Sequence, residues 1–305
     1  MRTFITATAL SLVAAAAMWT STASAKDITL GLAIPYFGQE YWATLQKGAE
    51  DAAAKAGVKL VVAESYNDAT KQTAQVEAFI ASKVDAILLP PANPQALAPV
   101  VEEASRANIP VIAVDTNIAG GKVTSFVASN NITVGKIAAK YIAERLKGNG
   151  NIFIGTWPQN EATLQRVVGF KEQLKEYPNV KIVAEQVAKL PPDTTAQAEA
   201  VLTAYPNIDA MFGISDVQTL PFWKVAKERG ISDKVFFVGV DATTEGLAAI
   251  KENSGYAGTV AQQPAEMGAL AVNTAIKVVN GEKVPANIEV PVTLVTYETL
   301  KATQK

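Results

Sequence analysis

Ten side chains stand just after predicted strands or early in predicted helices, and most have the types that bind a polyhydroxylated ligand. They are Tyr41, Trp42, Pro91, Asp115, Thr116, Trp157, Arg166, Ser215, Asp241 and Gln262. Aromatic faces pack on C–H groups, carboxylates accept hydrogen bonds from hydroxyls, and arginine and amide groups donate to them. Hydrogen bonds to charged groups are about twice as strong as neutral ones. The set therefore predicts a site for a small polar ligand.

The composition excludes much enzymatic chemistry, because the chain has no histidine and no cysteine. Ser-His-Asp and Cys-His nucleophilic sites and zinc sites built from His or Cys are ruled out. The sequence also has no calcium-binding loop, no G-x-G-x-x-G and no Walker A pattern. We therefore expect no catalytic residue, no metal and no cofactor.

The first 25 residues have the pattern of a secretory signal peptide. Arg2 precedes an almost unbroken apolar run over 5–19, and Ala23-Ser24-Ala25 has the small-x-small form of a cleavage site. The run is too short for a stable membrane span. We expect cleavage after Ala25 and function outside the cytoplasmic membrane. The formal net charge of −2 gives no sign of the basic face that nucleic-acid binding needs.

Short apolar runs alternate with amphipathic stretches along the rest of the chain. The expected strands are 28–34, 60–62, 86–89, 111–114, 123–128, 152–154, 182–184, 210–212, 235–238 and 256–261. The expected helices are 41–56, 70–82, 94–107, 134–146, 162–177, 195–204, 220–229 and 265–280. Repeated βα units with continuously apolar strands predict an α/β fold with two doubly wound parallel sheets. Ligands of such sheets bind beyond the carboxyl ends of the strands, where the ten side chains fall.

Several motifs, in this order and spacing, resemble periplasmic sugar-binding proteins of the ribose-receptor type, which feed ABC importers. The motifs are Glu40-Tyr41-Trp42, Lys47-Gly48-Ala49, 107–112 ending in Asp115, Ala128-Ser129-Asn130-Asn131, Gly135, Arg166 with Gly169-Phe170, Ser215-Asp216, Val238-Gly239-Val240-Asp241 and Ala261-Gln262-Gln263-Pro264. The resemblance covers roughly 27–295. It implies two Rossmann-like lobes, 26–129 plus 263–290 and 130–262 plus 291–305, joined by three hinge crossings and closing on a ligand.

The resemblance also implies roles for individual residues. Tyr41 and Trp42 match the stacking aromatics, and Asp115 matches a carboxylate that binds hydroxyls from the first lobe. In the second lobe Arg166, Asp241 and Gln262 match an arginine, a carboxylate and a hinge-side amide.

The chain departs from the ribose receptors at three positions of the site. They have Asn at Pro91, Arg at Thr116 and commonly Asn at Ser215. Because these replacements remove polar groups that a ligand would need, ribose is disfavoured. Another pentose, a hexose, a polyol or a less polar ligand fits equally well.

Several of these residues also have a purely structural interpretation. Asp115 could cap a loop, Asp241 could be a helix N-cap, and Asp216 is more typical of a group that bonds backbone at a helix start. Trp223 is expected in the core, and Leu190 is a weaker candidate for the site.

The leading hypothesis is a non-catalytic periplasmic receptor that passes a sugar or polyol to an ABC permease, acts as a monomer and also serves a chemoreceptor. The alternative is a sensor module of the same fold that reports to a membrane kinase or chemoreceptor. A lac-repressor-type effector domain lacks the required helix-turn-helix. A secreted carbohydrate hydrolase would use Asp115 and Asp241 as its two carboxylates. Hydroxyl recognition explains the same pair without catalysis.

Overall fold

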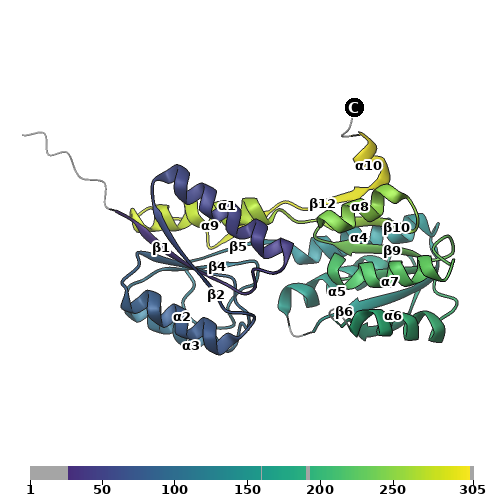
Figure 1. Cartoon of the computed structure of the whole chain (residues 1–305), viewed down its shortest axis with the longest axis horizontal. Helices are drawn as coiled ribbons and strands as arrows, with labels where there is room; N and C mark the ends of the chain where they lie inside the picture. Colours follow the sequence, from purple (N-terminus) through teal and green to yellow (C-terminus); the bar gives the residue numbers. More distant parts are fainter. Residues whose placement is uncertain (1–26, 159, 190–192, 303–305) are drawn as a thin grey trace, which may run out of the picture.

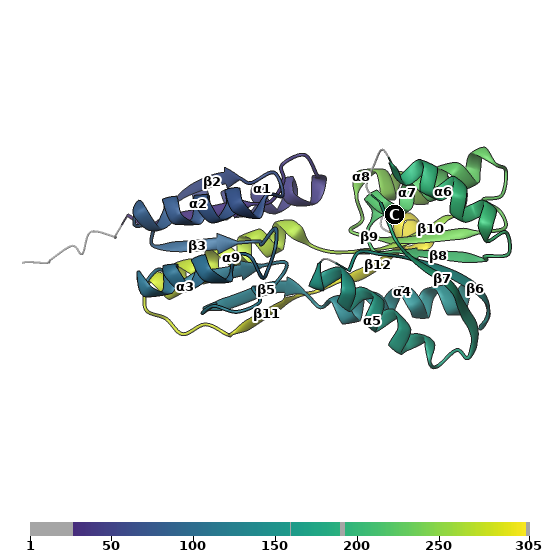
Figure 2. The same cartoon turned by 90° about the horizontal axis from the view of Figure 1, so that it is seen from below.

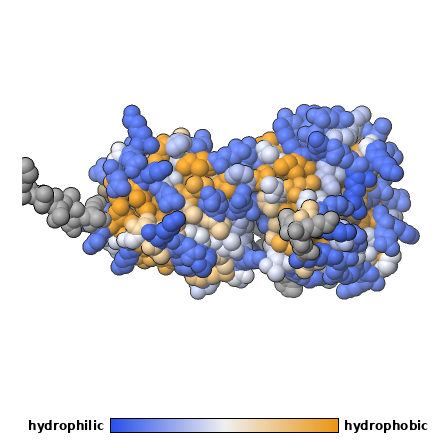
Figure 3. Space-filling view, turned by 90° about the horizontal axis from the view of Figure 1, so that it is seen from above, coloured by the Kyte–Doolittle hydropathy of each residue, from blue (hydrophilic) through white to orange (hydrophobic). Residues whose placement is uncertain are grey.

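The computed structural model describes residues 27–302 except 159 and 190–192, so the expected signal peptide and Leu190 lie outside the described residues. Two α/β bodies lie end to end (Figure 1), and the molecule narrows between them in the space-filling view (Figure 3). Each contains one six-stranded sheet. In the described part of the chain, no helix has both the length and the apolar character needed to cross a bilayer.

Lobe one is a sheet with two helices on each face. The strands lie in the order β11 (Asn287–Val290), β5 (Ser125–Ser129), β4 (Val111–Val114), β3 (Ala86–Leu89), β1 (Thr29–Ile34) and β2 (Lys59–Glu64). The helices are α1 (Glu40–Ala56), α2 (Ala69–Ala81), α3 (Ala98–Arg106) and α9 (Pro264–Val279). One apolar cluster joins α1 and α9 to the sheet, and a second joins α2 and α3 to its other face. All neighbouring strands are parallel, so the carboxyl ends of β1 to β5 meet at one edge.

Lobe two repeats this plan. Its strands lie in the order β12 (Thr293–Thr296), β10 (Tyr256–Ala261), β9 (Phe236–Val240), β8 (Ala210–Gly213), β6 (Asn149–Thr156) and β7 (Asn179–Val187). The helices are α4 (Asn131–Arg145), α5 (Glu161–Leu174), α6 (Asp193–Ala204), α7 (Asp216–Glu228), α8 (Thr244–Glu252) and α10 (Tyr297–Ala302). One apolar cluster lies under α4 and α5, and another under α6, α7 and α8. The predicted fold of two α/β lobes with mostly parallel sheets is confirmed.

The chain passes between the two bodies three times, after β5, after β10 and after β11. Figure 2 shows these connections running side by side between the lobes. The sequence analysis missed both strands that flank the third passage. β11 adds a parallel strand beside β5 in lobe one, and β12 pairs antiparallel with β10 in lobe two. The expectation of purely parallel pairing is therefore wrong for β12.

Two predicted helix starts are each wrong by four residues, for local reasons. The helix expected over 94–107 begins at Ala98, because Asn93 accepts hydrogen bonds from the backbone of Gln95 and Ala96 and holds a turn there. The helix expected over 220–229 begins at Asp216, one turn earlier, because Ser215 caps it and Pro221 is accommodated inside it.

Asp216 is a structural group, as the structural interpretation expected. It is fully buried and accepts hydrogen bonds from Tyr256, Thr259 and Thr243. Burial, with the nearby charge of Asp241, raises the pKa of Asp216 to about 7, while these hydrogen bonds act in the opposite direction. Trp223 is also in the core, as expected.

The raised pKa of Asp216 predicts a pH dependence of stability. Between about 3.8 and about 7 the folded chain holds a proton that the unfolded chain has lost. The contribution of this group to the free energy of unfolding therefore falls as pH rises through that window. Urea unfolding over this range should show the fall in the wild type relative to Asp216→Asn, which cannot titrate. Parallel curves for the two proteins would contradict it.

Candidate functional site

A cleft of about 590 Å³ lies between the lobes, and nine of the ten predicted residues line it. These nine are Tyr41, Trp42, Pro91, Asp115, Trp157, Arg166, Ser215, Asp241 and Gln262. They come from loops at the carboxyl ends of strands in both sheets and from the starts of α1 and α5. The parallel strand order brings these distant segments to facing edges, as expected for doubly wound sheets.

The lobe-one wall of the cleft is built around Asp115, which directly follows β4. Its backbone has a φ of 65°, in the left-handed region that Asp tolerates better than most residues. One carboxylate oxygen accepts from the Tyr41 hydroxyl at 2.5 Å and the other from the Thr116 hydroxyl at 3.0 Å. Burial raises the pKa of Asp115, opposed by these bonds and by Arg166. The rings of Tyr41 and Trp42 meet edge to face at 4.9 Å.

Arg166 is the central group of the lobe-two wall, buried on α5. Its Nε donates to the Asn131 side chain at 2.8 Å, and its Nη1 donates to the Ile214 carbonyl at 2.5 Å. These bonds fix the guanidinium 3.8 Å from the carboxylate of Asp241. Burial raises the pKa of Asp241, and Arg166 opposes the rise.

Gln262 completes this wall at the passage after β10. Its amide nitrogen donates to Asp241 at 2.7 Å. Its Oε1 is buried and has no hydrogen-bond partner among the described residues. Buried acceptors are rarely left unpaired in folded proteins. Because Gln262 lines the cleft, a ligand donor that reaches this oxygen would satisfy it.

Three further predicted residues are placed less directly for contact with a ligand in the cleft. Thr116 does not line the cleft. It is buried behind Asp115, donates to it, and accepts from the Asn160 amide of the other lobe at 3.4 Å. Ser215 faces the cleft, but its hydroxyl caps α7 and donates to Gln218 at 3.1 Å. Pro91 contributes a buried apolar surface.

The sequence analysis missed a group of polar lining residues. They are Gln39, Glu40, Asn67, Asn93, Asn160, Thr163, Gln218, Thr243 and Glu245. Asn67, Asn93 and Asn160 follow β2, β3 and β6, so the rule that identified Asp115 could have found them. In the sequence these asparagines are easily interpreted as turn or cap residues, and Asn93 and Asn160 do also hold local turns.

A further direct contact between the lobes lies at the mouth of the cleft. Glu40, the first residue of α1, accepts from the backbone nitrogen of Thr244 at 3.0 Å and from its hydroxyl at 2.7 Å. Thr244 is the first residue of α8, so the lobe-one carboxylate satisfies a free amide at a lobe-two helix N-terminus. Negative charge is favourable at that end of a helix. The contact can form only when the lobes are close together.

The free acceptor of Gln262 leads to a prediction for ligand binding. Gln262→Leu keeps the approximate size of the side chain and removes both its acceptor and its donor to Asp241. We expect an affinity loss of about two- to tenfold, the usual value of one hydrogen bond. Calorimetric titration with a ligand identified by thermal-shift screening measures this loss of affinity. Gln95→Leu, at an exposed position outside the cleft, is the control.

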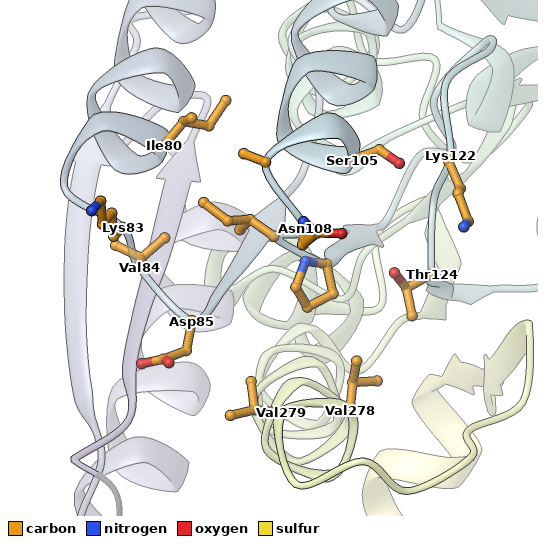
Figure 4. Close-up of a pocket in the computed structure, with 13 residues that line it drawn as sticks. Ile80, Lys83, Val84, Asp85, Ser105, Asn108, Lys122, Thr124, Val278 and Val279 are labelled. Carbon is orange, nitrogen blue, oxygen red and sulfur yellow. The ribbon is translucent and has the colours of Figure 1, made fainter.

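A second cavity of about 680 Å³ lies in lobe one, at the amino ends of its strands (Figure 4). Lys83, Asp85, Asn108 and Lys122 are among its polar lining residues. The carboxylate of Asp85 accepts from the backbone of Thr29 at 2.8 Å and so has a structural use. Proteins of this fold class bind ligands at the carboxyl ends of the strands, where the interlobe cleft lies. The second cavity lies at the opposite, amino end of the sheet.

Comparison with known proteins identifies the family. The model of the periplasmic binding protein domain matches residues 30–283. A ribose import binding protein of Escherichia coli is 34% identical over 294 residues, 96% of this chain and 98% of its own. A solved solute-binding protein of Bacillus halodurans with bound myo-inositol has a TM-score of 0.86 and 28% identity, covering 93% of this chain and 99% of its own. One from Actinobacillus succinogenes with bound D-allose has a TM-score of 0.85 and 28% identity, covering 90% and 99%.

The chain belongs to the periplasmic binding protein family, whose members are solute-binding receptors of ABC importers and not enzymes. The resemblance seen in the sequence is therefore confirmed. The hydrolase interpretation of Asp115 and Asp241 is set aside, because the family binds its ligands without converting them.

Proposed function

We propose that the protein captures a monosaccharide or polyol in the interlobe cleft and delivers it to an ABC permease. The observation that carries this proposal is the meeting of Asp115 with Arg166, Asp241 and Gln262 across one cleft that aromatic rings also line. The similar proteins with bound myo-inositol and D-allose support a hydroxyl-rich ligand. Pro91, Thr116 and Ser215 disfavour ribose, since none of them extends a free donor into the cleft.

Capture requires the lobes to close. We infer that 26–129 with 263–290, and 130–262 with 291–305, move as the two bodies about the three passages between them. The cross-lobe hydrogen bonds of Glu40 and of Thr116 support this, because closure would form them together with the binding site. Closure also creates the composite surface that a permease can distinguish from the open form.

The location and partners follow from the same proposal. Residues 1–25 direct export and are removed, and the mature chain works in the periplasm as a monomer. A chemoreceptor that reads the closed form is a second proposed partner. Light scattering of the mature protein, with and without ligand, tests the monomer, and a dimer on ligand binding would contradict it.

A thermal-shift screen of the mature protein against pentoses, hexoses, polyols, cyclitols and amino acids tests the function. A ligand present at about 1,000 times its Kd adds roughly 4 kcal/mol to stability. At roughly 2–4 °C per kcal/mol for a protein of this size, the shift is easily measured. A shift with a sugar or polyol supports the proposal. Silence across all sugars and polyols would overturn it and favour the sensor module.

A further inference from the structure

The cleft carries more negative than positive charge. Among the described residues that line it, Glu40, Asp115, Asp241 and Glu245 are acidic and Arg166 is the one basic side chain. Glu40 and Glu245 lie exposed at the mouth, whereas Asp115 and Asp241 line the interior. A cleft of one charge sign attracts ligands of the opposite sign.

Arg166 cannot compensate both interior carboxylates fully. Two of its guanidinium nitrogens are occupied by Asn131 and Ile214, and its ion pair is with Asp241 at 3.8 Å. The side-chain hydrogen bonds that Asp115 accepts come from neutral hydroxyls, those of Tyr41 and Thr116. A buried carboxylate without a full counter-charge destabilises the folded protein. Closure around a neutral ligand would increase that cost.

The uncharged groups of the cleft also suit a cation. The free Oε1 of Gln262 requires a donor, and an ammonium group has three N–H donors and no acceptor. Tyr41, Trp42 and Trp157 line the same cleft, and the faces of such rings attract cations. The cleft thus combines a carboxylate, a free acceptor and aromatic rings.

We propose that the ligand is a sugar or polyol that carries a protonated amine, with the ammonium group bound by Asp115 of lobe one. This inference rests on the proposed receptor function and specifies the ligand class. The hydroxyls of the ligand then bind Arg166 and Asp241. The ammonium group provides Asp115 with the counter-charge that Arg166 does not fully supply.

Matched compounds test the inference on the mature protein. Calorimetry is carried out at a pH where the amines are charged. It compares two sugar sets, D-glucose with D-glucosamine and N-acetyl-D-glucosamine, and the corresponding galactose series. It also compares two polyol pairs, sorbitol with 1-amino-1-deoxysorbitol and myo-inositol with an amino-deoxyinositol. We expect at least one amine to bind about tenfold or more tightly than its neutral and acetylated partners, a difference of about 1.4 kcal/mol. Neutral members that bind as well or better overturn the amine inference and leave the receptor function standing. Binding by no compound in any set overturns both.

A variant pair tests the role of Asp115. Asp115→Asn removes the charge, and asparagine accepts the positive φ at this position. We expect it to abolish the preference for the amine over its neutral partner. Asp51→Asn, which removes the same charge from an exposed site on α1, should keep the preference. An amine preference that survives in Asp115→Asn overturns the assignment to this carboxylate.

Discussion

Arg166→Ala is expected to abolish tight ligand binding, with a loss of about 100- to 1,000-fold or more. The guanidinium lies buried 3.8 Å from the carboxylate of Asp241, and its charge also acts to lower the pKa of the lobe-one carboxylate Asp115. Breaking a buried pair by removing one partner costs about 3–5 kcal/mol, because the remaining charge is left uncompensated. A tenfold change in affinity corresponds to about 1.4 kcal/mol. If the ligand-bound closed form bears this cost, the affinity falls by the amount given above.

Two matched variants separate a binding effect from unfolding. Arg166→Lys keeps the charge but lacks the planar fork that reaches Asn131 and Ile214 together, so its affinity should lie between wild type and Arg166→Ala. Arg229→Ala removes an exposed arginine that bonds only within lobe two, and should bind like wild type. Titration calorimetry gives the affinities, and circular dichroism shows whether each variant is folded. Wild-type affinity in folded Arg166→Ala would refute the site.

The sequence predicted the fold well because the βα alternation is a local signal. Every strand from β1 to β10 except β4 is followed by a helix before the next strand, and most of these strands contain an apolar run. β11 and β12 were missed because they are four-residue edge strands with partly exposed side chains. Each pairs with a strand distant in the sequence, so neither composition nor spacing marks it.

The lining of the cleft was predictable for residues that directly follow a strand, such as Asp115 and Asp241. It was not predictable where a side chain acts through another. Thr116 has the expected position, yet its hydroxyl is bonded to Asp115 behind the cleft. Asn131 belongs to one of the sequence motifs, but only the folded chain shows that it orients Arg166. Such roles depend on contacts between segments, which no local pattern contains.

Glu40→Ala is expected to weaken ligand binding by about tenfold to thirtyfold, mainly through faster release. The carboxylate of Glu40 accepts its hydrogen bonds from Thr244, across the mouth of the cleft. Hydrogen bonds to a charged group contribute about 1.5–3 kcal/mol, and the exposure of this pair places it toward the lower end. Because the contact exists only with the lobes together, its loss destabilises the closed form and leaves the open form unchanged.

Stopped-flow dissociation and small-angle scattering test this latch with a matched control. Glu245→Ala removes a carboxylate from the same mouth, but this carboxylate pairs with Lys224, inside lobe two. We expect Glu40→Ala to raise the dissociation rate about tenfold and to enlarge the scattering radius at subsaturating ligand, while Glu245→Ala changes neither. Thr244→Val keeps the backbone amide that donates a hydrogen bond to Glu40 and removes the hydroxyl that donates a second one. Its effect on the dissociation rate should therefore be smaller than that of Glu40→Ala. Equal rates in wild type and Glu40→Ala would show that closure is held by the ligand and the interior groups alone.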